Sequence, residues 1–237
     1  CEEAVVEEVA VPEMDVMFIM DRFGYCKIID TSAYERNKET IDSEFKYVCK
    51  VKNTGKICIF TNSGQLHTFK AKDLPLGKMR DKGVPVDNVS NFSSQKESIV
   101  SVNSQSELNL YRLIFVTKNS MCKLVDGGEF DVAKRTVAAT KLDEGDEVVC
   151  VAPLTEQKNI VLKTNEGYFL RFQIEEIPEK KKIALGARGM KLGARDYVEE
   201  VFFTRGMDDT EIPHNDKMLR LNDIKLARRD GKGSKIR

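Results

Sequence analysis

Apolar and polar positions along the chain follow a short repeating pattern that is not helical. Four segments each contain an apolar strand, a polar turn of two or three residues that ends in Gly or Ser, and a second strand with a basic residue. The turns end at Gly24, Gly64, Ser120 and Gly167, at spacings of 40, 56 and 47 residues. The flanks are rich in Ile, Val, Phe, Tyr and Thr, which favour strands, and the turn residues supply the positive φ angles of tight hairpins. Each segment is therefore predicted to be a β-hairpin.

A further apolar strand is predicted after each hairpin, at residues 47–51, 99–102, 147–151 and 200–203. A hairpin with returning strands every 40 to 56 residues is typical of the blades of a propeller-like ring. We therefore predict an all-β fold of about five to six four-stranded blades. A fifth, weaker repeat begins near Glu211, with its turn at His214-Asn215-Asp216. The only helix expected is a short one within Ser32 to Phe45.

The repeats predict one domain over residues 14–237. Its approximate blades are residues 14–54, 55–104, 105–156 and 157–206, with a partial blade at 207–237. Residues 1–13 carry five Glu and no Lys or Arg. This segment is either an acidic linker or a strand that closes the ring, and the sequence leaves both alternatives open.

Composition limits the classes of protein to consider. Hydrophobic residues make up 41% of the chain and charged residues 32%, which is enough to form a core and is not typical of disorder. There is no apolar run near the roughly 18 residues that span a bilayer. The acidic start has neither the basic nor the apolar region of a signal peptide. A cytoplasmic protein without membrane contact is expected.

Cysteine and histidine usage gives no indication of a metal or redox site. The six cysteines form no Cys-x-x-Cys pair, and most lie in apolar runs such as residues 56–60. They are expected to be reduced and to pack as small hydrophobic residues. The two histidines, His67 and His214, are far apart and lack clustered partners. We therefore predict no metal and no cofactor.

Charge is segregated along the chain. Lys and Arg together number 38, as do Asp and Glu, and this zero net charge by itself argues against nucleic acid. However, Lys180 to Arg195 contains six basic residues and no acidic one. Lys217 to Arg237 contains eight basic residues against Asp223 and Asp230. Such stretches are expected to form a basic surface.

The hairpin repeats, together with Ala187-Arg188-Gly189-Met190-Lys191-Leu192, resemble the C-terminal β-pinwheel domain of the A subunits of DNA gyrase and topoisomerase IV, over almost the whole chain. The resemblance implies a disc of Greek-key blades, with duplex DNA wrapped around a basic rim. It implies two partners, the rest of the topoisomerase A subunit together with the ATPase B subunit, and an isolated domain that is monomeric and located at the bacterial nucleoid. Because the catalytic tyrosine and metal of that family belong to another region, the domain is expected not to be an enzyme on its own.

Gyrases of this family carry a Gln-Arg-Arg-Gly-Gly-Lys-Gly box after the first hairpin. The corresponding segment, residues 35–41, has lost the glycines and gained two acids, so a topoisomerase IV type of subunit fits better than a gyrase type, although the sequence alone does not decide between them. Residues 227–233 agree with the box at five of seven positions. Weaker similarities are Arg80-Asp81-Lys82-Gly83, Lys134-Arg135-Thr136 and Arg188-Gly189-Met190-Lys191.

These segments predict the DNA contacts, since glycines let backbone N–H groups approach phosphates while Arg and Lys supply charge without base readout. The predicted contact residues are Arg228, Arg229, Lys232, Lys235, Arg188, Lys191, Arg80, Lys82, Lys27, Lys123 and Arg171. For the last three, the alternative is that a basic residue protects an edge strand from aggregation. For the C-terminal group, the alternative is a solvated tail.

Two other classes of function are considered. A propeller-like protein–protein interaction module needs no basic rim, and the neutral net charge fits it. An enzyme would need a nucleophile–base pair or a metal site, and two isolated histidines do not provide either.

Overall fold

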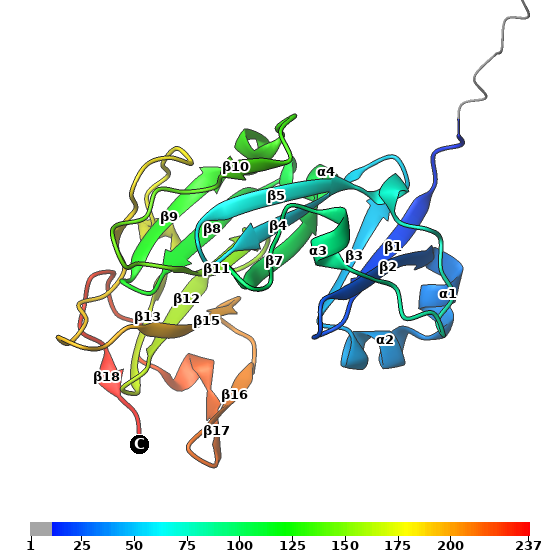
Figure 1. Ribbon diagram of the computed structural model, residues 1–237. Coiled ribbons are helices and arrows are strands. Elements are labelled where there is room, and N and C mark those ends of the chain that lie inside the picture. The colour runs from blue at the N-terminus through cyan, green and yellow to red at the C-terminus, as the bar shows by residue number, and fades with distance from the viewer. Residues whose placement is uncertain (1–10) are drawn as a thin grey trace, which may run out of the picture.

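The computed structural model describes residues 11–237 and places a hairpin and a third strand in each of the first four repeats (Figure 1). The hairpins are β1 (Asp15–Met20) with β2 (Tyr25–Asp30), β4 (Lys56–Thr61) with β5 (Gln65–Lys70), β8 (Arg112–Thr117) with β9 (Met121–Asp126), and β12 (Asn159–Thr164) with β13 (Tyr168–Gln173). The third strands are β3 (Tyr47–Lys52), β7 (Ile99–Ser104), β11 (Val148–Pro153) and β15 (Val198–Thr204). Each third strand pairs antiparallel with the first strand of its own hairpin.

The fourth strand of every sheet comes from the following repeat. These strands are β6 (Val84–Pro85), β10 (Thr136–Ala138), β14 (Ala187–Arg188) and β18 (Ser234–Lys235). They pair with β2, β5, β9 and β13 respectively, giving strand orders such as β3-β1-β2-β6. Consecutive repeats are therefore interlocked, and a sheet is not a contiguous stretch of chain.

The last repeat is a two-stranded hairpin, β16 (Glu211–His214) with β17 (Lys217–Arg220). The residues after it enter β18, which completes the preceding sheet instead of this one. The expected all-β, propeller-like fold is confirmed. The described residues form five sheets, at the lower end of the expected five to six; four are four-stranded, and the fifth, expected as a partial blade over residues 207–237, is this two-stranded hairpin.

Helices are short and connect the strands. The α-helices are α1 (Thr31–Arg36), α2 (Lys38–Glu44), α3 (Val86–Val89) and α4 (Gln105–Leu108), and the 3-10 helices are η1 (Ala71–Asp73), η2 (Gly127–Phe130), η3 (Ile174–Glu176) and η4 (Leu221–Asp223). Each 3-10 helix follows the second strand of a hairpin and starts the crossing to the preceding sheet.

Apolar layers hold neighbouring sheets together face to face. Because the inner strands are buried on both faces, they are continuous apolar runs, such as Val16 to Met20 in β1. Phe18 of the first sheet meets Phe69 of the second at 5.9 Å between ring centroids, and Phe60 of the second meets Phe115 of the third at 5.8 Å. Another layer joins the third sheet to the fourth.

Both ends of this row of sheets are covered. On the first sheet, Ile41 of α2 packs on Ile19 and Ile29. On the fourth sheet, Ile212 of the last hairpin packs near Phe169. Figure 1 shows α1 and α2 at one end of the structure and β16–β17 beyond β12 and β13. α1 and α2 together run from Thr31 to Glu44, where one short helix was expected within Ser32 to Phe45.

The third and fourth strands lie at opposite edges of each sheet. β7 contacts β3 and β11, and β11 also contacts β15, so the third strands are neighbours at the centre. The fourth strands lie at the opposite edge in every strand order, which places β6, β10, β14 and β18 at the perimeter. Among residues 11–237, no helix is long and apolar enough to cross a membrane.

The perimeter strands need glycine where the chain joins them. Gly83 has φ of +84°, and a Cβ there would lie 2.4 Å from the carbonyl oxygen of Cys26. Gly145 also has positive φ, +79°, but nothing lies within 4 Å of its Cβ position. We expect Gly145→Ala to lower the free energy of unfolding by about 1–2 kcal/mol, the cost of the left-handed backbone. Gly83→Ala should cost roughly 1–3 kcal/mol more because of the clash. Urea unfolding of both variants measures the difference, and equal losses would contradict the close approach of β6 to β2.

Cysteine reactivity tests the burial of the sheets. The five described cysteines are unbonded, and burial raises the pKa of each of the thiols of Cys26, Cys49, Cys58, Cys122 and Cys150 to about 12. Since the thiolate is the nucleophile, the thiols of a Cys1→Ser variant, including the half-buried Cys49 and Cys150, should react only slowly with a disulfide reagent at pH 8 until the protein is unfolded in guanidinium. Rapid labelling of the folded protein would contradict this packing.

Candidate nucleic-acid interface

Four loops carry the chain from a 3-10 helix to the outer edge of the preceding sheet. We call them crossover loops A (residues 74–83), B (131–135), C (177–186) and D (224–233). Loops A, C and D begin in the same way, because Leu76, Glu179 and Leu226 each form a parallel bridge to the second strand of the preceding hairpin. All four loops therefore lie at the perimeter of the domain.

Loops A, C and D also end in the same way. Gly83, Gly186 and Gly233 each precede a fourth strand, and a Cβ at these positions would lie 2.3–2.5 Å from a carbonyl oxygen of β2, β9 or β13. Loop B is shorter and has Thr136 at this position. The glycines that end the box-like segments, Gly83 and Gly233, thus allow the chain to pass close to the preceding sheet where the fourth strand joins it.

Charge is concentrated in the crossover loops. They contain twelve basic residues against four acidic ones, although the chain as a whole is neutral. Ten of the twelve side chains are exposed, the exceptions being Lys182 and Arg229, which are half-buried. The perimeter is therefore basic.

Loops C and D meet around Gly189. The Asp230 amide donates to the Gly189 carbonyl at 2.7 Å, and the Lys191 amide donates to the Gly231 carbonyl at 2.8 Å. The Arg188 guanidinium donates to both carboxylate oxygens of Asp230, at 2.5 and 3.2 Å. These hydrogen bonds hold the pKa of Asp230 below its usual range, so the ion pair persists at neutral pH. The segment that resembles the box is thus fastened to its neighbour, and Asp230 offsets the charge of Arg188.

Arg229 belongs to the same fastening. Its guanidinium donates to the Arg188 carbonyl at 2.9 Å, its amide donates to Glu176 at 3.3 Å, and its Nε is buried without a partner. By contrast, Arg228, Lys232 and Lys235 are exposed and form no ion pair within residues 11–237. These three cations are free to meet an external anion.

Arg80 and Lys82 lie in loop A, which runs along the first sheet, and both are exposed. The Lys82 ammonium sits over the ring of Tyr25, 4.3 Å from its centroid. Lys235 has a similar relation to Tyr168, at 5.9 Å. Since the two tyrosines hold the same position in β2 and β13, the basic perimeter extends from the first sheet to the fourth.

Three of the predicted DNA-contact residues are buried, so the prediction that they contact DNA is wrong. Lys27, Lys123 and Arg171 are 3%, 2% and 8% exposed. Their side chains donate to carbonyl oxygens of loop A, loop C and the start of loop D. They do not protect edge strands either, because β2, β9 and β13 are inner strands. These cations anchor loops inside the fold.

One similarity to the box has a different register from the others. Gly186, not Gly189, is the counterpart of Gly83, so Arg188 to Lys191 follow loop C instead of forming it. The basic residues within loop C are Lys180, Lys181 and Lys182. No glycine stands next to these lysines, so the Arg-Gly and Lys-Gly pattern does not include them, although their charge is evident in the sequence.

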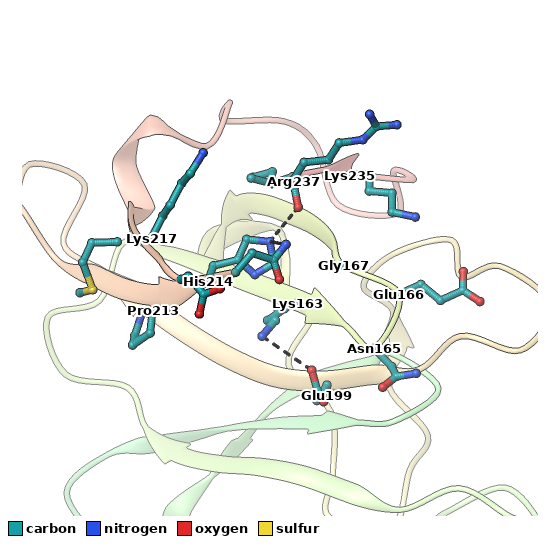
Figure 2. Close-up of a pocket in the computed structure, with 14 residues that line it drawn as sticks. Lys163, Asn165, Glu166, Gly167, Glu199, Pro213, His214, Lys217, Lys235 and Arg237 are labelled. Carbon is teal, nitrogen blue, oxygen red and sulfur yellow. Dashed lines mark hydrogen bonds and ion pairs between the residues drawn. The ribbon is translucent and has the colours of Figure 1, made fainter.

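A polar cavity of about 570 Å³ lies between the turn at residues 165–167 and the last hairpin (Figure 2). Within it, Lys163 pairs with Glu199 at 3.7 Å and with Glu200 at 3.3 Å. The Nε2 atom of His214 lies 2.7 Å from the carbonyl oxygen of Ile236. Lys163–Glu199 is the only ion pair between two lining residues in the part of the chain that the structure describes. Among residues 11–237, no group of three His, Cys, Asp or Glu is placed to hold a metal ion.

Comparison with known proteins identifies relatives of this fold. The chain matches the family described as DNA gyrase C-terminal domain, beta-propeller, over residues 55–106, 111–154 and 158–205, which is more than half of its length. The A subunit of DNA gyrase from Lawsonia intracellularis is 26% identical over 213 residues, covering 84% of this chain and 26% of that protein. Its counterpart from Helicobacter pylori strain 26695 is 28% identical over 187 residues, covering 74% and 23%. The chain therefore spans about a quarter of the length of these curated relatives.

Solved structures share the arrangement of strands. The crystal structure of the C-terminal domain of DNA topoisomerase IV superimposes with a TM-score of 0.81 at 21% identity, covering 95% of this chain and 73% of that one. The E. coli ParC C-terminal domain gives a TM-score of 0.72 at 14% identity, covering 94% of both chains. At these identities the likeness concerns the fold. Together with the family match, the interlocked sheets show that this chain belongs to the DNA gyrase C-terminal domain family, the β-pinwheel of type II topoisomerase A subunits.

Proposed function

We propose that this domain binds duplex DNA without sequence specificity and bends or wraps it along the perimeter formed by the crossover loops. The observation that carries this proposal is the gathering of twelve basic residues in four equivalent loops of a neutral chain. Phosphate contacts of this kind position DNA without reading its sequence. The domain itself performs no catalysis and serves as an accessory part of an ATP-dependent type II topoisomerase.

The energetic requirement is set by DNA stiffness. Bending 20–30 base pairs by 40–90° costs on the order of 1–6 kcal/mol. Each phosphate that is neutralised releases counterions, and several such contacts offset that cost. Loops distributed from the first sheet to the fourth give a curved track for one duplex, whereas a single basic cluster would hold DNA without bending it. In this role the domain would act at the bacterial nucleoid. Its protein partners would be the remainder of the A subunit and the ATPase B subunit.

The first repeat favours a topoisomerase IV type of protein. Residues 35–41, where a gyrase box would stand, belong to α1 and α2. These helices cover the first sheet through Ile41 instead of forming a basic crossover loop. A domain without that box is proposed to guide DNA for decatenation and relaxation, and not to fasten a tight wrap for negative supercoiling.

Duplex length separates wrapping from simple binding. A long mixed-sequence duplex should bind this domain markedly tighter than a short one, because more loops engage it. The logarithm of the association constant should fall with the logarithm of salt by about 0.9 for each phosphate neutralised. Fluorescence anisotropy across a salt series measures both effects. Equal affinity for the two lengths would contradict wrapping, and no binding at low salt would favour a protein-interaction module.

Three free cations test where DNA binds. Replacing Arg228, Lys232 and Lys235 with Ala together should weaken binding and flatten the salt dependence by about 0.9 for each phosphate that is no longer neutralised. A control variant with Lys38, Lys96 and Lys158 replaced by Ala removes the same charge from exposed positions outside the crossover loops. The control should retain most of the affinity and the original slope. The same loss in both variants would mean that net charge, and not the perimeter, governs binding.

A further inference from the structure

Two buried lysines are each surrounded by carbonyl oxygens of a crossover loop. The Lys27 ammonium donates to the carbonyls of Lys78 and Met79, both at 2.9 Å, and of Asp81 at 2.5 Å. The Lys123 ammonium donates to the carbonyls of Lys181 at 3.2 Å and of Lys182 and Ala184, both at 2.7 Å. An ammonium has three donors, and each cage uses all of them.

The two cages are the same structure built twice. In both loops the three carbonyls belong to the residues five, four and two positions before the glycine that precedes the fourth strand. Lys27 and Lys123 also share one register position in β2 and β9. His67 and Leu170 stand at that position in the other two sheets, and neither side chain can supply three donors.

The cage determines which way the loop amides point. In a trans peptide the C=O and the following N–H point in opposite directions. Carbonyls turned inward to Lys27 therefore turn the N–H groups of Met79, Arg80 and Lys82 outward. Among residues 11–237, none of these three amides donates to a protein acceptor. Loop A thus presents unused N–H groups at its surface.

Charge adds to this orientation. The positive ends of three peptide dipoles face outward, and a buried ammonium lies behind them. The side chains of Lys78, Arg80 and Lys82 belong to the same loop and are exposed, against one exposed acidic side chain, Asp81. Successive backbone N–H groups that face the same side of a loop can bind an anion. Burial lowers the pKa of both caged lysines, that of Lys123 to about 8, while the Asp81 carboxylate acts in the opposite direction on the pKa of Lys27.

In loop C one of the outward-pointing amides binds a carboxylate of the protein itself. The Lys182 amide donates to a carboxylate oxygen of Glu129 at 3.4 Å. In loop A the corresponding amide belongs to Met79 and has no such acceptor among the described residues. In loop A the Asp81 carboxylate accepts instead from the neighbouring Lys78 amide at 2.7 Å, which leaves the Met79 and Arg80 amides without an acceptor among the described residues.

We propose that crossover loop A is a phosphate-binding site in which the N–H groups of Met79 and Arg80 and the side chain of Arg80 bind one phosphate group. Lys27 is its positioning residue and does not touch the ligand. The identification of that phosphate as part of a DNA backbone rests on the proposed function, whereas the site itself does not.

Amide chemical shifts test the site directly. In ¹⁵N-labelled protein, titration with inorganic phosphate and with a short mixed-sequence duplex should shift the amide signals of Met79 and Arg80. The Lys182 amide should respond less, because Glu129 already occupies it, and the Gly145 amide, outside all four loops, should not respond. Shifts at Met79 and Arg80 with both ligands support the proposal.

Variants separate the amides from the side chains. Arg80→Gln should weaken phosphate binding but keep the amide response at saturation. Lys27→Met should abolish the response of both amides and weaken duplex binding by about 5-fold, with the slope of log K against log salt reduced by about 0.9. Lys123→Met removes the equivalent cage and should affect duplex binding less. An unchanged spectrum of β1, β4 and β8 checks that the variants fold, and the wild-type titration decides the site even if one does not.

The outcomes distinguish this site from the wider function. Duplex binding without shifts at Met79 and Arg80 would overturn the site and leave DNA binding intact. Shifts with inorganic phosphate but no duplex binding would support the site and overturn DNA as the source of the phosphate. No shift with either ligand would overturn the site. A wild-type response in folded Lys27→Met would overturn the positioning role of Lys27.

Discussion

The exchange of one strand between consecutive repeats is the constraint on which the rest of this structure depends. Each sheet is completed by two or three residues of the following repeat, which pair with β2, β5, β9 or β13. To reach that edge, the chain must pass around the outside of the preceding sheet. The crossover loops, their exposure and the close approach of Gly83, Gly186 and Gly233 to a neighbouring carbonyl all follow from this path. The basic residues are at the perimeter because the crossings are there.

Strand exchange also explains how much of the fold was predictable. The hairpins are local, and apolar runs on either side of a polar turn were sufficient to place all five of them. The fourth strands were not predicted, because two or three residues such as Val84–Pro85 carry no periodic pattern and their partners lie more than 50 residues away. The fifth sheet has only two strands for the same reason, because the last repeat contributes β18 to the preceding sheet.

The candidate site was predicted only in part. Exposed cations such as Arg228 and Lys232 were found because they lie in a Gly-containing loop. Lys27 and Lys123 were misassigned because a basic residue in a strand was taken to face solvent. Each lies between apolar residues of an inner strand whose two faces are both covered, so no alternation could expose it. A cation at such a position must find acceptors inside the protein, and the crossover loop is the nearest segment with free carbonyls.

Buried and exposed cations therefore have separate roles in one perimeter. The exposed residues supply charge that an external anion can share, and their effect is screened by salt. The buried lysines donate all their ammonium hydrogens to backbone carbonyls. They therefore fix the conformation of the crossover loop by orienting its peptide groups. Overall neutrality is compatible with a nucleic-acid interface under this division, because acidic residues elsewhere, such as those of α1 and α2, reduce net charge without entering the loops. In the second sheet His67 stands at the lysine position, and crossover loop B is short. In the fourth sheet Leu170 stands there, and crossover loop D is held instead by Arg171, which donates to the Ile224 carbonyl, and by the pair of Asp230 with Arg188. Each crossover loop is thus fixed in place by a means suited to its own length and sequence.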